Sequence, residues 1–63
     1  MTDDTVYLFT YRDALGKEKY MAIYEETRSE AEKRYNAARE ATDRLVGSTK
    51  LTSKQYRDWK KSL

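Results

Sequence analysis

Residues 6–24 read VYLFTYRDALGKEKYMAIY, and this stretch decides the fold expected for the chain. Two runs of strand length, residues 6–12 and 19–25, are rich in β-branched and aromatic residues. They flank the segment DALGK, in which Gly16 is the residue that can adopt a positive φ without steric cost. A type I turn over residues 13–16 is therefore predicted to close a β-hairpin with a three-residue loop.

Charge favours one register of this hairpin. Pairing Arg12 with Glu18 and Asp13 with Lys17 places opposite charges side by side, whereas a slip of one residue brings like charges together and destabilises the sheet. This register sorts the side chains onto two faces, and both faces are apolar. One face carries Tyr7, Phe9, Tyr11, Lys19, Met21 and Ile23, and the other carries Val6, Leu8, Thr10, Tyr20, Ala22 and Tyr24. Both faces are therefore expected to be covered.

A long helix over residues 28–46 is predicted to supply one cover. Thr27 and Glu30 match a capping box, no Gly or Pro interrupts the segment, and Gly47 stands where a helix C-cap belongs. Small and apolar residues recur at helical spacing on its inward side. These residues are Ala31, Tyr35, Ala38, Thr42, Leu45 and Val46. The core is expected to contain Leu8, Tyr35, Ala38, Leu45, and either Ile23 or Ala22, depending on which sheet face the helix covers.

A short second helix is predicted over residues 53–62. Thr52 and Gln55 form another capping box, and Tyr56, Trp59 and Leu63 share one side of the helix. The whole chain, residues 1–63, is then one small α+β domain. It consists of a two-stranded antiparallel β-hairpin followed by one long and one short α-helix, in the order ββαα.

Composition argues against catalysis. The chain has no His and no Cys, so the usual general base, the strongest nucleophile, the common zinc ligands and disulfides are all missing. No catalytic residue, metal site or cofactor is therefore predicted, and the chain is not expected to be an enzyme. The acidic start MTDDT has no signal-peptide pattern, and no apolar run is long enough to span a membrane. A cytoplasmic protein without membrane insertion is expected.

Charge is distributed unevenly along the chain. Residues 1–27 hold three basic and six acidic groups, whereas residues 47–63 hold five basic groups and one acidic group. The second helix is thus basic and amphipathic, which is typical of contacts with nucleic acid, an acidic protein or an anionic membrane. The candidate nucleic-acid-binding residues are Lys54, Arg57, Lys60 and Lys61. The alternative is that these side chains only solvate the outside of a terminal helix.

Tyr7, Phe9 and Tyr11 form an aromatic row along one sheet face. The long helix can cover one face of the hairpin, but the short helix is too small to cover the whole of the other, so this row is predicted to be a protein interface. The leading hypothesis is a small non-catalytic protein-binding module. Such a module could modulate or inhibit a larger host complex, as is typical of small accessory proteins of phages and mobile elements. The alternatives are a homodimer and a nucleic-acid-binding protein that uses the basic helix.

Overall fold

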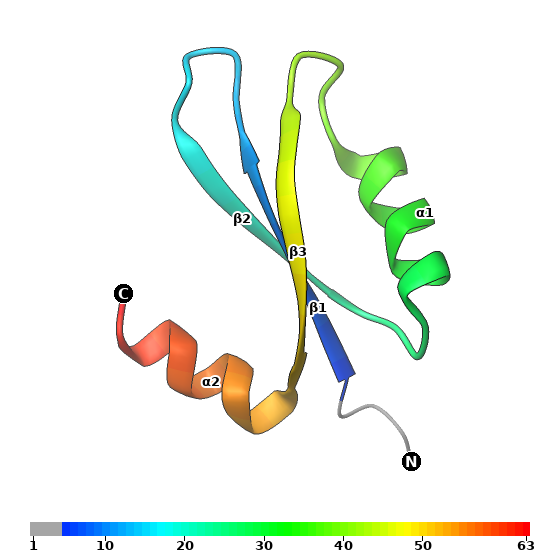
Figure 1. Cartoon of the computed structure of the whole chain (residues 1–63), viewed down its shortest axis with the longest axis vertical. Helices are drawn as coiled ribbons and strands as arrows, with labels where there is room; N and C mark the ends of the chain where they lie inside the picture. The colour runs from blue at the N-terminus through cyan, green and yellow to red at the C-terminus, as the bar shows by residue number, and fades with distance from the viewer. Residues whose placement is uncertain (1–4) are drawn as a thin grey trace.

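The computed structural model describes residues 5–63 and shows an α+β fold with a central sheet between two helices (Figure 1). The elements in order are β1 (Thr5–Arg12), β2 (Glu18–Tyr24), α1 (Arg28–Ala38), β3 (Arg44–Thr52) and α2 (Ser53–Lys61). The strand order is β2-β1-β3, and β1 is antiparallel to both neighbours. β2 and β3 are therefore parallel to each other and are joined across β1 through α1. The α+β class is confirmed, whereas the predicted order ββαα is wrong.

The hairpin of β1 and β2 has the register predicted from charge. Arg12 pairs with Glu18, and the side chains alternate between the two faces as expected. Gly16 has a φ of 82° and donates its backbone N–H to the Asp13 carbonyl oxygen over 2.9 Å. The Asp13 carboxylate also accepts the backbone N–H groups of Leu15 and Lys17, each over 2.9 Å. A turn over residues 13–16 with Gly16 at positive φ is confirmed, and the aspartate side chain adds to its stability.

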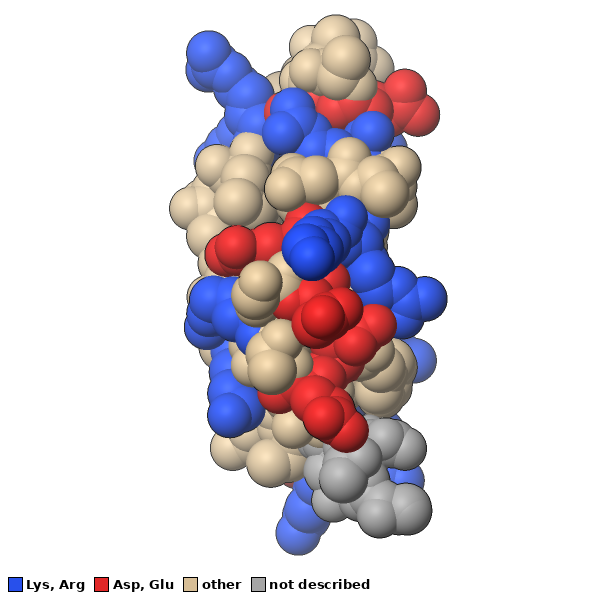
Figure 2. All heavy atoms as spheres, turned by 90° about the vertical axis from the view of Figure 1, so that its right-hand side faces the viewer, with Lys and Arg blue, Asp and Glu red and all other residues tan. Residues whose placement is uncertain are grey.

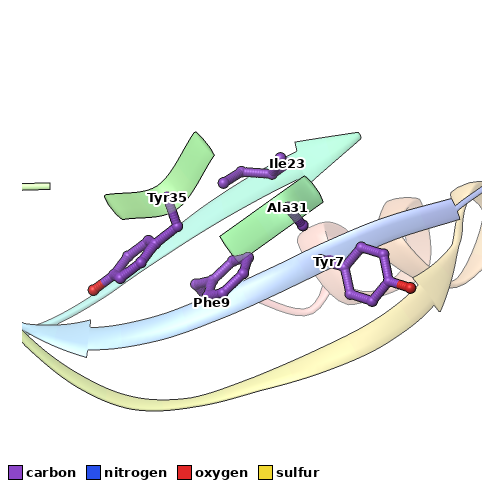
Figure 3. Packing of buried hydrophobic residues seen from close by; sticks show 5 residues of the cluster. All are labelled: Tyr7, Phe9, Ile23, Ala31 and Tyr35. Atoms are coloured by element: carbon purple, nitrogen blue, oxygen red, sulfur yellow. The ribbon is translucent and has the colours of Figure 1, made fainter. Parts of the chain in front are cut away.

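The main core lies between α1 and one face of the hairpin (Figure 3). Tyr7, Phe9 and Ile23 from the sheet pack there against Ala31 and Tyr35 from α1. The two helical residues are four positions apart and so lie on one face of the helix. Ala31 is small enough to let the helix lie close to the sheet, and Tyr35 fills the space beside Phe9 (Figure 3). On the other face of the sheet, Val6 and Leu8 are buried as well.

The predicted long helix is wrong, because α1 ends at Ala38. Arg39 already has an extended backbone, with φ −75° and ψ 157°. The Asp43 carboxylate accepts the backbone N–H of Glu40 over 2.9 Å, and the Asp43 N–H donates to the Glu40 carbonyl oxygen over 3.1 Å. These local hydrogen bonds form a turn and compete with continuation of the helix.

Residues 44–52, the first three of which overlap the predicted helix, form the third strand instead. Val46, Thr49 and Thr52 are β-branched, and branched side chains fit a pleated strand better than a helix. The pairing with β1 shifts between Thr10 and Tyr11, so that Val46 is the extra residue of a β-bulge. The residue predicted as a helix C-cap, Gly47, therefore lies within a strand.

The correction to α1 also changes the core. Leu8, Tyr35 and Ile23 are buried as predicted, but Ala38 is exposed and Leu45 is 49% exposed. Ala38 is the last residue of α1, and Leu45 belongs to an edge strand that α1 does not cover. Both core assignments are wrong because they depended on a helix that continued to residue 46.

The second helix is confirmed with nearly the predicted bounds. Thr52 is its N-cap and accepts the Gln55 backbone N–H over 3.1 Å, while the Gln55 side chain accepts the Thr52 N–H over 2.9 Å. This reciprocal pair is a complete capping box. Because α2 follows directly from β3, the third strand determines where the basic helix begins.

Candidate functional site

The aromatic row predicted as a protein interface lies beneath α1. Phe9 is fully buried and stacks on Tyr35 with ring centroids 4.7 Å apart, and Tyr11 packs against the same tyrosine at 6.0 Å. Tyr7 is also buried, with the Arg28 guanidinium 5.2 Å from its ring centroid. The expectation that this face lacks a cover within the chain is therefore wrong. The interface through these three rings was predicted because their sheet face was expected to be uncovered, and the structure removes that reason.

The predicted nucleic-acid-binding residues all lie on α2, and all are exposed. They are Lys54, Arg57, Lys60 and Lys61, and they are called the basic group below. Arg57, Lys60 and Lys61 together line a shallow hollow of about 360 Å³. Lys60 lies over the ring of Tyr56, with its Nζ atom 5.3 Å from the centroid. The fold thus brings one cation of the basic group, Lys60, next to an aromatic ring.

Four aromatic side chains meet where α2 crosses the sheet. Tyr56 and Trp59 from α2 and Tyr20 and Tyr24 from β2 are called the aromatic cluster below. Tyr20 meets Trp59 edge to face at 4.9 Å, and Tyr24 meets Tyr56 in the same manner at 6.2 Å. The two α2 rings lie 5.9 Å apart with their planes 19° from parallel. The cluster packs α2 onto the sheet without being sealed from solvent.

The exposure of the cluster distinguishes it from the core. Tyr20 is 43% exposed and Tyr24 is 50% exposed, although both lie on the face that α2 covers. A groove of about 400 Å³ runs beside the cluster and is lined by both apolar and basic residues. Its lining includes Leu8, Tyr20, Trp59, Lys19, Lys60 and Leu63. A ligand in this groove would contact ring surface and ammonium groups at once.

The opposite side of the molecule has different electrostatics. Figure 2 shows the side on which α1 lies, where acidic side chains form a central band with basic side chains on both sides of it. Glu30 and Glu32 of α1 are exposed, whereas Asp58 is the only acidic residue of α2. An anionic ligand is therefore favoured at α2 over the outer face of α1.

The two groups with altered pKa values, Asp13 and Tyr35, do not line the groove beside the aromatic cluster. The backbone N–H of Lys17 lowers the pKa of Asp13, and the side chain of Lys19 contributes through a contact of 3.3 Å. Burial raises the pKa of Tyr35. Both shifts follow from turn structure and core packing. Among residues 5–63, no group of three or more acidic side chains is arranged to hold a metal ion.

The sequence analysis named the basic group as a candidate site but did not include Tyr20 and Tyr24, which belong to the aromatic cluster beside Lys60. The predicted register already placed both tyrosines on one face of the hairpin. The apolar side of the second helix, with Tyr56 and Trp59, was the signal that could have linked them to this helix. That link requires β3, which carries α2 to this face.

Comparisons with known proteins found no match to this chain, whether among family models, curated proteins or solved structures. Among the described residues, no helix is both long and apolar enough to cross a membrane. The site must therefore be interpreted from its own geometry.

Proposed function

We propose that this chain is a non-catalytic binding module for single-stranded nucleic acid, with the ligand on α2 and the adjoining face of β2. One observation carries the proposal: half-exposed rings of the aromatic cluster lie beside Lys60 of the basic group, and Lys19 lines the same groove. Unpaired bases stack on aromatic side chains, and Lys and Arg bind the backbone phosphates. A surface with both features suits this ligand.

Stacking and charge would have separate tasks on this surface. Tyr20 and Tyr24 present ring surface from the edge strand, and each stacked base contributes about 1–3 kcal/mol of binding free energy. The basic group contributes through release of counterions from phosphates, so that log K falls by roughly 0.7 per phosphate contact for each unit of log salt. Neither contribution reads a specific base, and we expect weak sequence preference.

A nucleic-acid ligand is favoured over a protein ligand bound to the sheet face that carries Tyr7, Phe9 and Tyr11. The hypothesis of a protein ligand there required a sheet face without cover, and α1 covers it. The exposed rings lie instead on the α2 side, where the surrounding charges are positive. The alternative function from the sequence is therefore the one that the geometry supports best.

The experiment uses Trp59, which is the only tryptophan of the chain and belongs to the aromatic cluster. Titration with a single-stranded oligonucleotide should quench its fluorescence, and the affinity should fall as salt rises. A duplex of the same sequence should bind less tightly, because its bases are already stacked. Equal affinity for duplex and single strand, or no binding at low salt, would overturn the proposal.

Two matched variants separate charge from a general loss of structure. Arg57→Glu and Lys33→Glu make the same change of charge at exposed helical positions, one on α2 and one on α1. Arg57→Glu should weaken binding strongly, while Lys33→Glu should have little effect. Tyr24→Leu keeps an apolar side chain but removes the ring, and it should cost about 1–3 kcal/mol of binding if a base stacks there.

A protein partner remains a second candidate, at a different place. β3 is an edge strand in which Leu45 and Val46 are exposed, and such an edge can accept a further strand. The added strand could come from another protein or from a second copy in a homodimer. Nuclease-resistant retention of a host protein that Val46→Lys abolishes would support a protein partner. Sedimentation equilibrium of the wild-type protein and of the Val46→Lys variant would test for the homodimer.

A further inference from the structure

Two arginines stand directly opposite each other near the loop end of the sheet. Arg12 at the end of β1 pairs with Arg44 at the start of β3. Side chains alternate along β1, so that Arg12 is on the same face as Leu8 and Thr10, which is the α2 side. Directly opposed residues share a face, and like charges in such a pair repel each other. A sheet without a ligand gains nothing from this pair.

The acidic residues nearby do not neutralise the pair. Asp13 binds backbone N–H groups of its own turn and forms an ion pair with Lys19. Asp43 is 7% exposed and binds the Glu40 N–H. Glu18 neighbours Arg12 across the hairpin, yet the ion pairs within residues 5–63 do not include it.

A third arginine adjoins the pair. Arg39 lines the same groove as Arg12 and Arg44, and this groove has a volume of about 730 Å³. Arg39 donates to the carbonyl oxygens of Glu40 and Asp43 over 3.3 and 2.9 Å, and Arg12 donates to that of Gly16 over 3.1 Å. Backbone carbonyls thus orient two of the guanidinium groups. Each guanidinium has five N–H donors, so most donors stay available to a ligand.

An open stretch of sheet joins this groove to the aromatic cluster. Thr10 pairs with Gly47 between the two sites, on the face shared with Leu8 and Arg12. A Cβ atom added at Gly47 would meet no heavy atom within 4 Å. Since Thr10 is small and Gly47 has no side chain, no large side chain projects from the sheet at this pair. An extended ligand could lie across it.

We infer that Arg12, Arg39 and Arg44 form a phosphate-binding site for the nucleic-acid strand that occupies the groove beside the aromatic cluster, which is called the α2 groove below. The inference rests on the proposed function and adds a direction to it: the strand leaves the aromatic cluster, crosses Gly47 and places a phosphodiester between the guanidinium groups. Guanidinium groups bind phosphate oxygens through paired charge-assisted hydrogen bonds. The bound phosphate would also remove the repulsion between Arg12 and Arg44.

The test compares a short oligonucleotide that fills only the α2 groove with a longer one, using Trp59 fluorescence at several salt concentrations. Arg44→Gln should weaken binding of the longer strand roughly tenfold at low salt and reduce its salt slope by roughly 0.7. The short strand should bind this variant as it binds the wild-type protein. Lys33→Gln removes one charge from α1 and is the control, which should leave both strands unaffected.

The outcomes distinguish the two proposals. Equal affinity of Arg44→Gln and wild-type protein for the longer strand would overturn the arginine site and leave the α2 surface intact. An equal loss for both strands would also overturn it, since the effect would then be a general one of charge. Failure of the wild-type protein to bind either strand would overturn both the site and the proposed function.

Discussion

Phe9 and Tyr35 stack almost parallel, with ring centroids 4.7 Å apart and planes only 6° from parallel. One residue comes from the central strand and the other from the helix that covers it, and both are fully buried. Their contact helps to attach α1 to the sheet. The stack also buries a polar group. Within the described residues, the buried Tyr35 hydroxyl has no hydrogen-bond partner, which lowers the stability of the fold.

Replacing Tyr35 by Phe should therefore leave the free energy of unfolding unchanged or raise it by about 1 kcal/mol. The ring stays in place, and an unsatisfied buried hydroxyl is removed. Tyr35→Ala should lower the free energy of unfolding by about 3–5 kcal/mol through loss of the ring. Urea unfolding of the two variants measures both effects. A clear loss of stability in Tyr35→Phe would show that the hydroxyl has a partner.

The turn after α1 should depend on the Asp43 carboxylate. Asp43→Ala removes the acceptor of the Glu40 N–H and should cost about 1–2 kcal/mol of stability. Asp43→Asn keeps an acceptor oxygen and should cost less. Thr42→Ala changes the exposed neighbour and is the control. Equal stability of all three variants, measured by thermal unfolding, would contradict the role given to this side chain.

Leu45→Ala separates the observed strand from the helix predicted by sequence. If Leu45 were a core residue of a long helix, the substitution would lower the free energy of unfolding by about 2–4 kcal/mol. Because Leu45 is half-exposed on β3, we expect a decrease of no more than about 1 kcal/mol. Leu8→Ala is the matched comparison, since Leu8 is buried on the central strand, and it should lose about 2–5 kcal/mol. If the two variants lost the same amount, the strand assignment of residues 44–52 would be wrong.

Acid should weaken the hairpin turn through Asp13. Its pKa lies below the ordinary value of 3.8, chiefly because the carboxylate accepts the Lys17 N–H. A lowered pKa means that the ionised form stabilises the folded state. This stabilisation is complete above the ordinary pKa and is lost as the pH falls through the lower, folded value. Carboxyl chemical shifts across an acid titration measure it, and a folded pKa at or above 3.8 would contradict the turn geometry.

The hairpin could be predicted from sequence because its signals are local. The turn needs Gly16, and the charges of Arg12 and Glu18 choose the register. The second helix could be predicted from sequence equally well, because Thr52 and Gln55 mark its first turn. In each case the deciding residues are a few positions apart and need no distant partner.

The third strand could not be found in the same way. Leu45 and Val46 fall at helical spacing from Tyr35, and Gly47 suits both a helix cap and a strand bulge. Pairing with β1 decides between these interpretations, and it involves residues far away in sequence. The aromatic cluster was missed for the same reason, because Tyr20 meets Trp59 only after β3 has carried α2 across the sheet.

The central position of β1 affects how the chain folds during synthesis. β1 and β2 leave the ribosome as a complete hairpin, but β3, the second neighbour of β1, is synthesised later. Arg12 and Thr5 can form their pairs with Arg44 and Thr52 only after that. Until then one edge of the most apolar strand is open, and the pairing that closes it spans most of the chain. Long-range pairing of this kind slows folding and leaves an edge able to capture other chains. The nascent protein is thus most vulnerable to aggregation in the interval between its second and third strands.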